Sequence, residues 1–216
     1  MAERIGPASP IGMRKVHVGC GPHAVMEDWW NIDIRKFPGI DEAFDATEAW
    51  HYRDLHYVYA EHFLEHLALD RAIQFLIQAG NSLREGGVIR LSTPNHEWVV
   101  HTHFQTGQTE EGKRLMDTLR MNRAFHGWGH QFLYSQEMLV YILSAIGYTA
   151  ILPCTYGQSN HQELNSLEKH GGFSVAGGFP SVVILEATRG FPLLRYPTDL
   201  SAYLEENYLR YVASGH

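Results

Sequence analysis

The feature that most constrains this chain is a short apolar strand, residues 15–18, that runs directly into Gly-Cys-Gly at residues 19–21. Glycines let the backbone turn sharply and let a ligand approach without a Cβ in the way. Asp33 ends the next predicted strand and Asp45 ends the one after it. Because ligands of open α/β sheets collect at the carboxyl ends of the strands, this order predicts a nucleotide-binding core over residues 14–95. The alternative is that both acids merely solvate strand ends.

Strands and helices alternate along most of the chain, a pattern typical of a parallel sheet with layered packing. Further strands are predicted over residues 31–34, 43–45, 55–60, 88–92, 149–155 and 181–187. Helices are predicted over residues 67–83, 136–146 and 198–213. Ser135 is a suitable N-cap and Gly147 a suitable end for the middle helix. Thr198 or Asp199 is expected to cap the last one.

The chain of 216 residues suits one α/β domain with a few additions. Residues 1–13 are interpreted as a loose leader, and residues 14–190 as the domain itself. Residues 96–133 are polar, aromatic and rich in histidine, and we expect them to form an insertion over the carboxyl edge of the sheet. Residues 191–216 are expected to form a C-terminal helical tail.

Composition excludes several classes of partner. The net charge is −7 and no run of Lys or Arg is present, whereas binding of a nucleic-acid backbone needs a basic face. Two cysteines make no disulfide framework. No stretch has a signal-peptide pattern or the ~20 apolar residues that span a bilayer. We therefore expect a cytoplasmic protein with no nucleic-acid or membrane partner.

Five segments together resemble the class I S-adenosylmethionine-dependent methyltransferases, and more narrowly a small bacterial type-11-like group. They read VHVGCGPH, NIDI, FDATE, VYAEHFLEHL and LREGGVIRLSTPN. The resemblance implies a Rossmann-like α/β fold whose seven-stranded sheet is mostly parallel with its last strand antiparallel. Residues 181–187 fit that last strand. A dinucleotide fold fits less well, since Asp33 follows the glycine turn too soon to leave room for a helix.

The resemblance also implies S-adenosylmethionine as the cofactor. The glycine turn would line its methionine part, Asp33 would hold the ribose, and Asp45 with Ala46 would face adenine. The chain departs from many members by lacking a third glycine after the turn. The full set of predicted cofactor-binding residues is Gly19, Cys20, Gly21, Asp33, Ile34, Asp45, Ala46 and Glu61.

Three histidines are predicted as candidates for a catalytic base: His62, His126 and His130. Histidine suits the task because its pKa lies near neutral pH. His126 and His130 have H-x-x-x-H spacing, but the two glycines between them favour a loop, so no metal site is predicted. Phe125 and Trp128 are expected either to stack on an acceptor or to fill the core.

These observations favour methylation of a small polar molecule, with oxygen of a sugar or secondary metabolite as the preferred acceptor. One alternative is a protein that binds S-adenosylmethionine but has weak or no catalysis. Another is a methyltransferase that acts on nitrogen or on a protein. The apolar side of the C-terminal helix is expected to pack on the body, with a homodimer as a further possibility.

Overall fold

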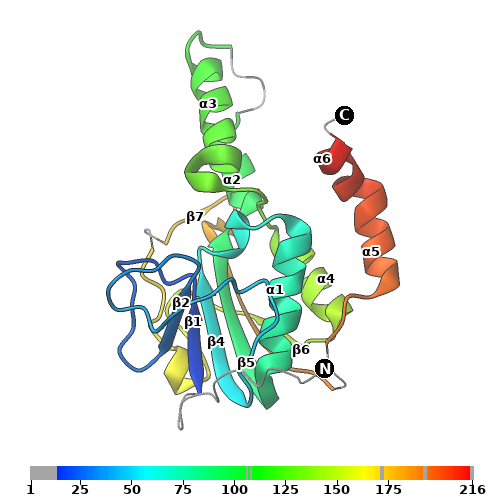
Figure 1. Cartoon of the computed structure of the whole chain (residues 1–216). Coiled ribbons are helices and arrows are strands. Elements are labelled where there is room, and N and C mark those ends of the chain that lie inside the picture. Colours follow the sequence, from blue (N-terminus) through cyan, green and yellow to red (C-terminus); the bar gives the residue numbers. More distant parts are fainter. Residues whose placement is uncertain (1–13, 106, 108, 171–172, 192–193, 215–216) are drawn as a thin grey trace.

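The computed structural model describes residues 14–214 except 106, 108, 171–172 and 192–193. The predicted leader therefore lies outside the described residues. The chain forms a seven-stranded sheet in the order β3-β2-β1-β4-β5-β9-β6 (Figure 1). The strands are β1 (Lys15–Val18), β2 (Trp30–Asp33), β3 (Glu42–Ala43), β4 (Leu55–Glu61), β5 (Leu83–Pro94), β6 (Thr149–Pro153) and β9 (Val182–Thr188). A separate hairpin pairs β7 (Val175–Ala176) with β8 (Phe179–Pro180).

The direction of the strands confirms the predicted fold class. Strands β1 to β5 pair in parallel, whereas β9 is antiparallel to both of its neighbours, β5 and β6. The parallel strands carry their carboxyl ends to one edge of the sheet. That edge faces α2 (His96–His103) and α3 (Lys113–His126), which stand above it in Figure 1.

Two helices, α1 (Leu69–Ser82) and α4 (Gln136–Ile146), cover one face of the sheet (Figure 1). The boundaries of α4 confirm the prediction. The Ser135 side chain accepts a hydrogen bond from the Met138 amide at 3.1 Å, and Gly147 ends the helix at φ +113°. Glycine is favoured at a position with this left-handed conformation, because glycine has no Cβ to clash with the backbone.

Two predicted element ends are wrong. The N-cap of α5 (Thr198–Leu204) is Pro197 with no side-chain cap, so neither Thr198 nor Asp199 has that role. Strand β5 begins at Leu83 directly after α1, whereas the sequence predicted a strand only from residue 88. The pairing with β4 shifts register across this stretch, so the glycines form an irregularity within the strand.

The C-terminal segment continues from α5 through a π-helical stretch, Glu205–Leu209, into α6 (Arg210–Ser214). Leu200 and Leu204 are buried in the main core, so one side of α5 packs on the body as expected. The homodimer stays a prediction. Among the described residues, no helix combines the length and the apolar character needed to cross a membrane.

The opposite face of the sheet is covered by irregular chain. Strand side chains alternate between faces, and Tyr59 and Val88 point away from α1 to contact Leu164. Among the described residues 19–29, the crossover from β1 to β2 contains no helix. We use the name back segment for residues 154–170, which supply Leu164 and cover this face.

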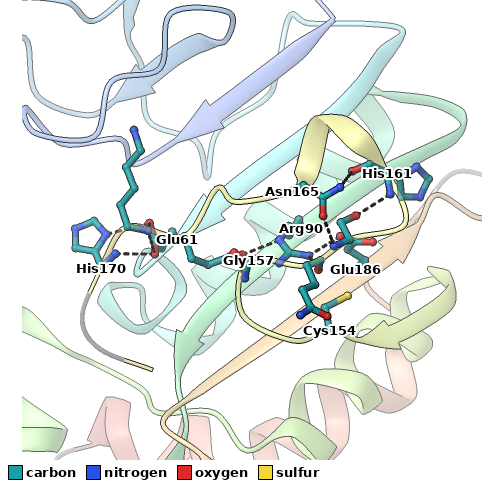
Figure 2. A network of polar contacts seen from close by, with 12 residues as sticks. Glu61, Arg90, Cys154, Gly157, His161, Asn165, His170 and Glu186 are labelled. Carbon is teal, nitrogen blue, oxygen red and sulfur yellow. Dashed lines mark hydrogen bonds and ion pairs between the residues drawn. The ribbon is translucent and has the colours of Figure 1, made fainter. Parts of the chain in front are cut away.

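The back segment is attached to the sheet by a buried ion network. Arg90 of β5 has no exposed surface; its Nε lies 2.7 Å from Glu168 and its Nη1 lies 2.5 Å from Glu186 of β9. The other oxygen of Glu168 accepts from the Gly157 amide at 2.9 Å. In Figure 2, Arg90 and Glu186 lie near the centre of this network, and Glu61 with His170 lies at its left end. The network fixes both ends of the back segment against the sheet.

We expect Arg90→Met to lower the free energy of unfolding by about 3–5 kcal/mol, because it leaves two carboxylates buried without their cation. The matched control is Lys113→Met, which removes an ion pair with Glu110 between side chains that are more than half exposed. Lys113→Met should lower the free energy of unfolding by less than about 1 kcal/mol. Urea denaturation of both variants measures the difference, and equal small losses would contradict the buried-network assignment.

Candidate functional site

The carboxyl ends of β1, β2 and β4 surround a cavity of about 450 Å³, here called the strand-end pocket. It has the size of a small-molecule site. The predicted cofactor-binding residues that line it are Gly19, Asp33, Ile34, Asp45 and Ala46. Its other lining residues are Val18, Ile32, Arg35, Phe44, His62, Phe63, His66, Leu67 and Trp128.

The glycine turn is shaped by its neighbours. Gly19 has φ +65°, and a Cβ built on it would lie 2.4 Å from Cδ2 of Phe63. Gly21 has φ +55°, and its amide donates to Asp33 at 3.1 Å. Cys20 lies between them with its side chain buried and outside the lining of the pocket. Of the three turn residues, Gly19 lines the cavity, whereas Cys20 and Gly21 do not.

The two predicted acids differ in their surroundings. Asp33 is nearly buried, and its Oδ1 accepts from the Arg35 amide at 2.9 Å. Asp45 is more exposed; the Thr47 hydroxyl donates to it at 2.7 Å and Arg71 lies 3.6 Å away. The Thr47 hydroxyl is the main group that lowers the pKa of Asp45, with a smaller effect of Arg71. Such fixed carboxylates suit the hydrogen-bond donors of a ligand.

Glu61 does not line the strand-end pocket. Its buried carboxylate accepts from the amides of Lys169 and His170 at 2.9 and 3.0 Å, and the His170 ring lies 3.0 Å away (Figure 2). Burial raises the pKa of Glu61, but these donors together outweigh burial and lower it. The structure therefore gives Glu61 the task of holding the end of the back segment, and its predicted cofactor contact stays a prediction.

A second cavity of about 470 Å³ lies beneath α2 and α3, and we name it the histidine pocket. The predicted insertion thus contributes much of its wall. Three residues, His62, His66 and Trp128, line both cavities, so the pockets share a wall. The remaining lining residues are Pro94, Trp98, Val99, His103, Arg123, Ala124, His130, Leu133 and His170.

His62 follows β4 and stands at that shared wall. Its φ of +47° is rare for a residue with a Cβ, and such strain often accompanies functional sites. Its Nδ1 lies 3.0 Å from Oε1 of Glu65, which is fully buried. Burial lowers the pKa of His62, but the contact with Glu65 and the charge of Glu61 outweigh burial and raise it.

The other two candidate bases are separated by the fold. Helix α3 ends at His126, and residues 127–129 form a short 3-10 turn in which Trp128 has a non-helical φ of +56°. The two histidines therefore do not share one helix, in agreement with the loop that the two glycines favoured. His126 is exposed and lines neither pocket, whereas His130 lines the histidine pocket. Phe125 packs against the small core beneath α3, and Trp128 is exposed at the mouth of both pockets.

Sequence reasoning missed His170 as a site residue. Its ring lies 5.3 Å from that of His62, and it lines the histidine pocket. His170 ends the segment HQELNSLEKH, in which the sequence predicted no site residue. His170 lies more than 100 residues beyond Glu61 in the sequence, and the two residues meet only because the back segment folds against the sheet.

Comparisons with known proteins show the fold. No family model and no curated protein matches the chain. A SAM-dependent methyltransferase from Archaeoglobus fulgidus has 18% identity and a TM-score of 0.52, covering 82% of this chain and 86% of that one. A possible histamine N-methyltransferase from Thermotoga maritima has 14% identity and a TM-score of 0.52, covering 82% of each chain.

A third solved structure, a S-adenosylmethionine-dependent methyltransferase from Clostridium acetobutylicum, has 12% identity and a TM-score of 0.50, covering 82% and 84%. The chain spans half the length of some matched chains, such as the CurJ carbon methyltransferase. The chain therefore has the fold of the class I S-adenosylmethionine-dependent methyltransferases.

We expect Gly19→Ala to be more harmful than Gly21→Ala. Both positions are left-handed, which costs a residue with a Cβ about 1–2 kcal/mol. Only the methyl group at residue 19 would also displace Phe63 from the strand-end pocket, since a Cβ at residue 21 meets nothing within 4 Å. Urea unfolding of the two variants tests this order, and equal stability losses would contradict it.

Proposed function

We propose that this chain transfers a methyl group from S-adenosylmethionine to a hydroxyl oxygen of a small polar molecule. The observation that carries the proposal is the wall shared by the two pockets. Donor and acceptor in neighbouring cavities would meet at His62, which is paired with the buried Glu65. Holding two reactants in contact is a large part of the catalysis of such displacements.

The strand-end pocket fits the proposed cofactor in its chemistry. Asp33 offers a nearly buried carboxylate for ribose hydroxyls, and Asp45 offers an acceptor for the adenine amino group. Ile34 is largely exposed at the pocket wall, where its side chain suits contact with an adenine ring. The backbone at Gly19 is open to the cavity and suits the methionine part. When bound, the cofactor supplies an electrophilic methyl group on a sulfonium together with the leaving group.

His62 is the group best placed to accept the proton of the acceptor. In such a transfer the acceptor oxygen would take the methyl group, and the electron pair of the carbon–sulfur bond would leave with the sulfur. The hydroxyl proton then passes to Nε2 of His62, because Nδ1 faces Glu65. The buried carboxylate orients the ring and stabilises its protonated form, as in other histidine–carboxylate pairs.

The lining of the histidine pocket supports a small polar acceptor with a ring. Trp98 and Trp128 offer faces for stacking on a sugar or an aromatic ring, and several histidines offer polar contacts. A sugar or a secondary metabolite fits this combination. The net charge of −7 and the absence of a Lys/Arg run speak against nucleic acid as acceptor.

Binding of the cofactor is tested with Asp33→Ala. We expect the parent protein to bind S-adenosylmethionine in calorimetry and the variant to bind at least tenfold more weakly, because it loses charge-assisted bonds to the ribose. The control is Asp28→Ala, an exposed acid between β1 and β2 outside the strand-end pocket. No binding by the parent, or equal binding by Asp33→Ala, would overturn the assignment.

The base is tested with His62→Gln, for which we expect a fall in kcat of about 10²–10⁴-fold with little change in cofactor affinity. The measurement is release of S-adenosylhomocysteine with the best acceptor from a panel of monosaccharides and phenols. His126→Gln, the exposed histidine, should keep the parent rate. If no acceptor on the panel turns over, the alternative of a cofactor-binding protein without catalysis is favoured.

A further inference from the structure

The sequence predicted no metal site. The fold nevertheless brings together three possible metal ligands, and they differ from the H-x-x-x-H pair of His126 and His130. Glu65, His66 and His130 each place one ligand atom within 4.8 Å of the other two. Two of them line the histidine pocket, and His66 also lines the strand-end pocket. We propose that these three residues bind a divalent transition-metal ion that holds the acceptor hydroxyl beside the cofactor.

The buried carboxylate of Glu65 is the first argument. The side chain has no exposed surface, and its Oε2 accepts from the Thr93 hydroxyl at 2.9 Å. Its Oε1 lacks a hydrogen-bond partner of good geometry and has His62 Nδ1 at 3.0 Å as an ion-pair contact. One hydrogen bond and one ion-pair contact thus serve a fully buried carboxylate, and a bound cation would further offset the cost of its burial.

The orientation of His130 is the second argument. Its Nδ1 lies 2.8 Å from the carbonyl oxygen of Ala124 and therefore donates to it. The proton is then fixed on Nδ1, which leaves the lone pair of Nε2 free for a ligand. Metal-binding histidines characteristically donate their other nitrogen to a carbonyl or carboxylate in this way.

The backbone holds the three ligands together, although His130 lies 64 residues beyond His66 in the sequence. The carbonyl oxygen of Glu65 accepts from the amides of Gln131 and Phe132 at 2.6 and 3.3 Å. The side chain of Gln131 donates to the carbonyl oxygen of His66 at 2.7 Å. The rings of His66 and His130 are 5.1 Å apart. The site is therefore built into the docking of residues 130–132 on the turn after β4.

The donor set selects the kind of ion. Two imidazoles and one carboxylate suit Mn²⁺, Fe²⁺, Co²⁺ or Zn²⁺ better than Mg²⁺ or Ca²⁺, which prefer oxygen ligands. Bonds of about 2.0–2.2 Å require donor atoms somewhat closer than 4.8 Å, so ion binding would draw the three side chains together. Three protein ligands leave positions open for an acceptor oxygen.

An ion at this place complements the proposed base. A bound hydroxyl becomes more acidic because the metal stabilises its anion. The ion would orient the acceptor oxygen at the shared wall, and His62 would receive its proton. This second role rests on the proposed function, whereas ion binding itself does not.

The experiment titrates the full chain with Co²⁺ alone, followed by calorimetry and by the visible absorption of the bound ion, which reports nitrogen ligands. We expect one equivalent to bind, and we expect His66→Ala and His130→Ala each to weaken binding more than about tenfold. Glu65→Gln, which keeps the shape of the side chain, should weaken it likewise. His126→Ala is the matched control and should bind as the parent does. Circular dichroism confirms that each variant is folded.

Absence of Co²⁺ binding, or equal weakening by His126→Ala, overturns the metal site. Titration of His130→Ala with S-adenosylmethionine separates this result from the proposed function, since the strand-end pocket does not include His130. Retained cofactor binding with lost Co²⁺ binding supports both proposals. Parent protein that binds Co²⁺ but not S-adenosylmethionine supports the metal site and contradicts the proposed function.

Discussion

The buried cation of Arg90 is the interaction on which the arrangement of the site depends. A guanidinium without exposed surface needs its carboxylates, and Glu168 and Glu186 come from separate parts of the chain. The pairing forces the back segment to lie along β5 and β9. At the end of that segment, the amides of Lys169 and His170 reach Glu61, the last residue of β4. The buried charge of Arg90, between the sheet and the back segment, thereby fixes His170 at the carboxyl edge of the sheet.

The same strand end carries two histidine–carboxylate pairs side by side. Glu61 contacts His170, Glu65 contacts His62, and the two rings are 5.3 Å apart. Both carboxylates are buried, so their electrostatic effect on the rings is larger than in water. This concentration of polar groups between two cavities distinguishes the site from the apolar packing on the α1 face. It supports chemistry at the wall between the pockets.

Local patterns predicted most of the fold. Ser135 and Gly147 marked the ends of α4 because capping depends on neighbouring backbone groups alone. The alternation of strands and crossovers predicted the parallel sheet, and the family resemblance, not a local pattern, predicted that residues 181–187 form the antiparallel strand. The predictions for the start of β5 and for the N-cap of α5 were wrong. Strand pairing with β4 extended β5 back to Leu83 through the glycines at residues 86–87.

The sequence by itself determined the strand-end pocket, because its glycine turn and acids follow successive strands and must meet at one edge of a parallel sheet. It did not determine which histidines belong to the site. His126 and His130 look equivalent in the sequence, but they lie on either side of the turn at residues 127–129. His126 is exposed to solvent, whereas His130 lines the histidine pocket. His170 and the cluster of Glu65, His66 and His130 exist only in the folded chain. Hydrogen bonds and ion pairs between distant segments create them, and no local pattern encodes such pairings.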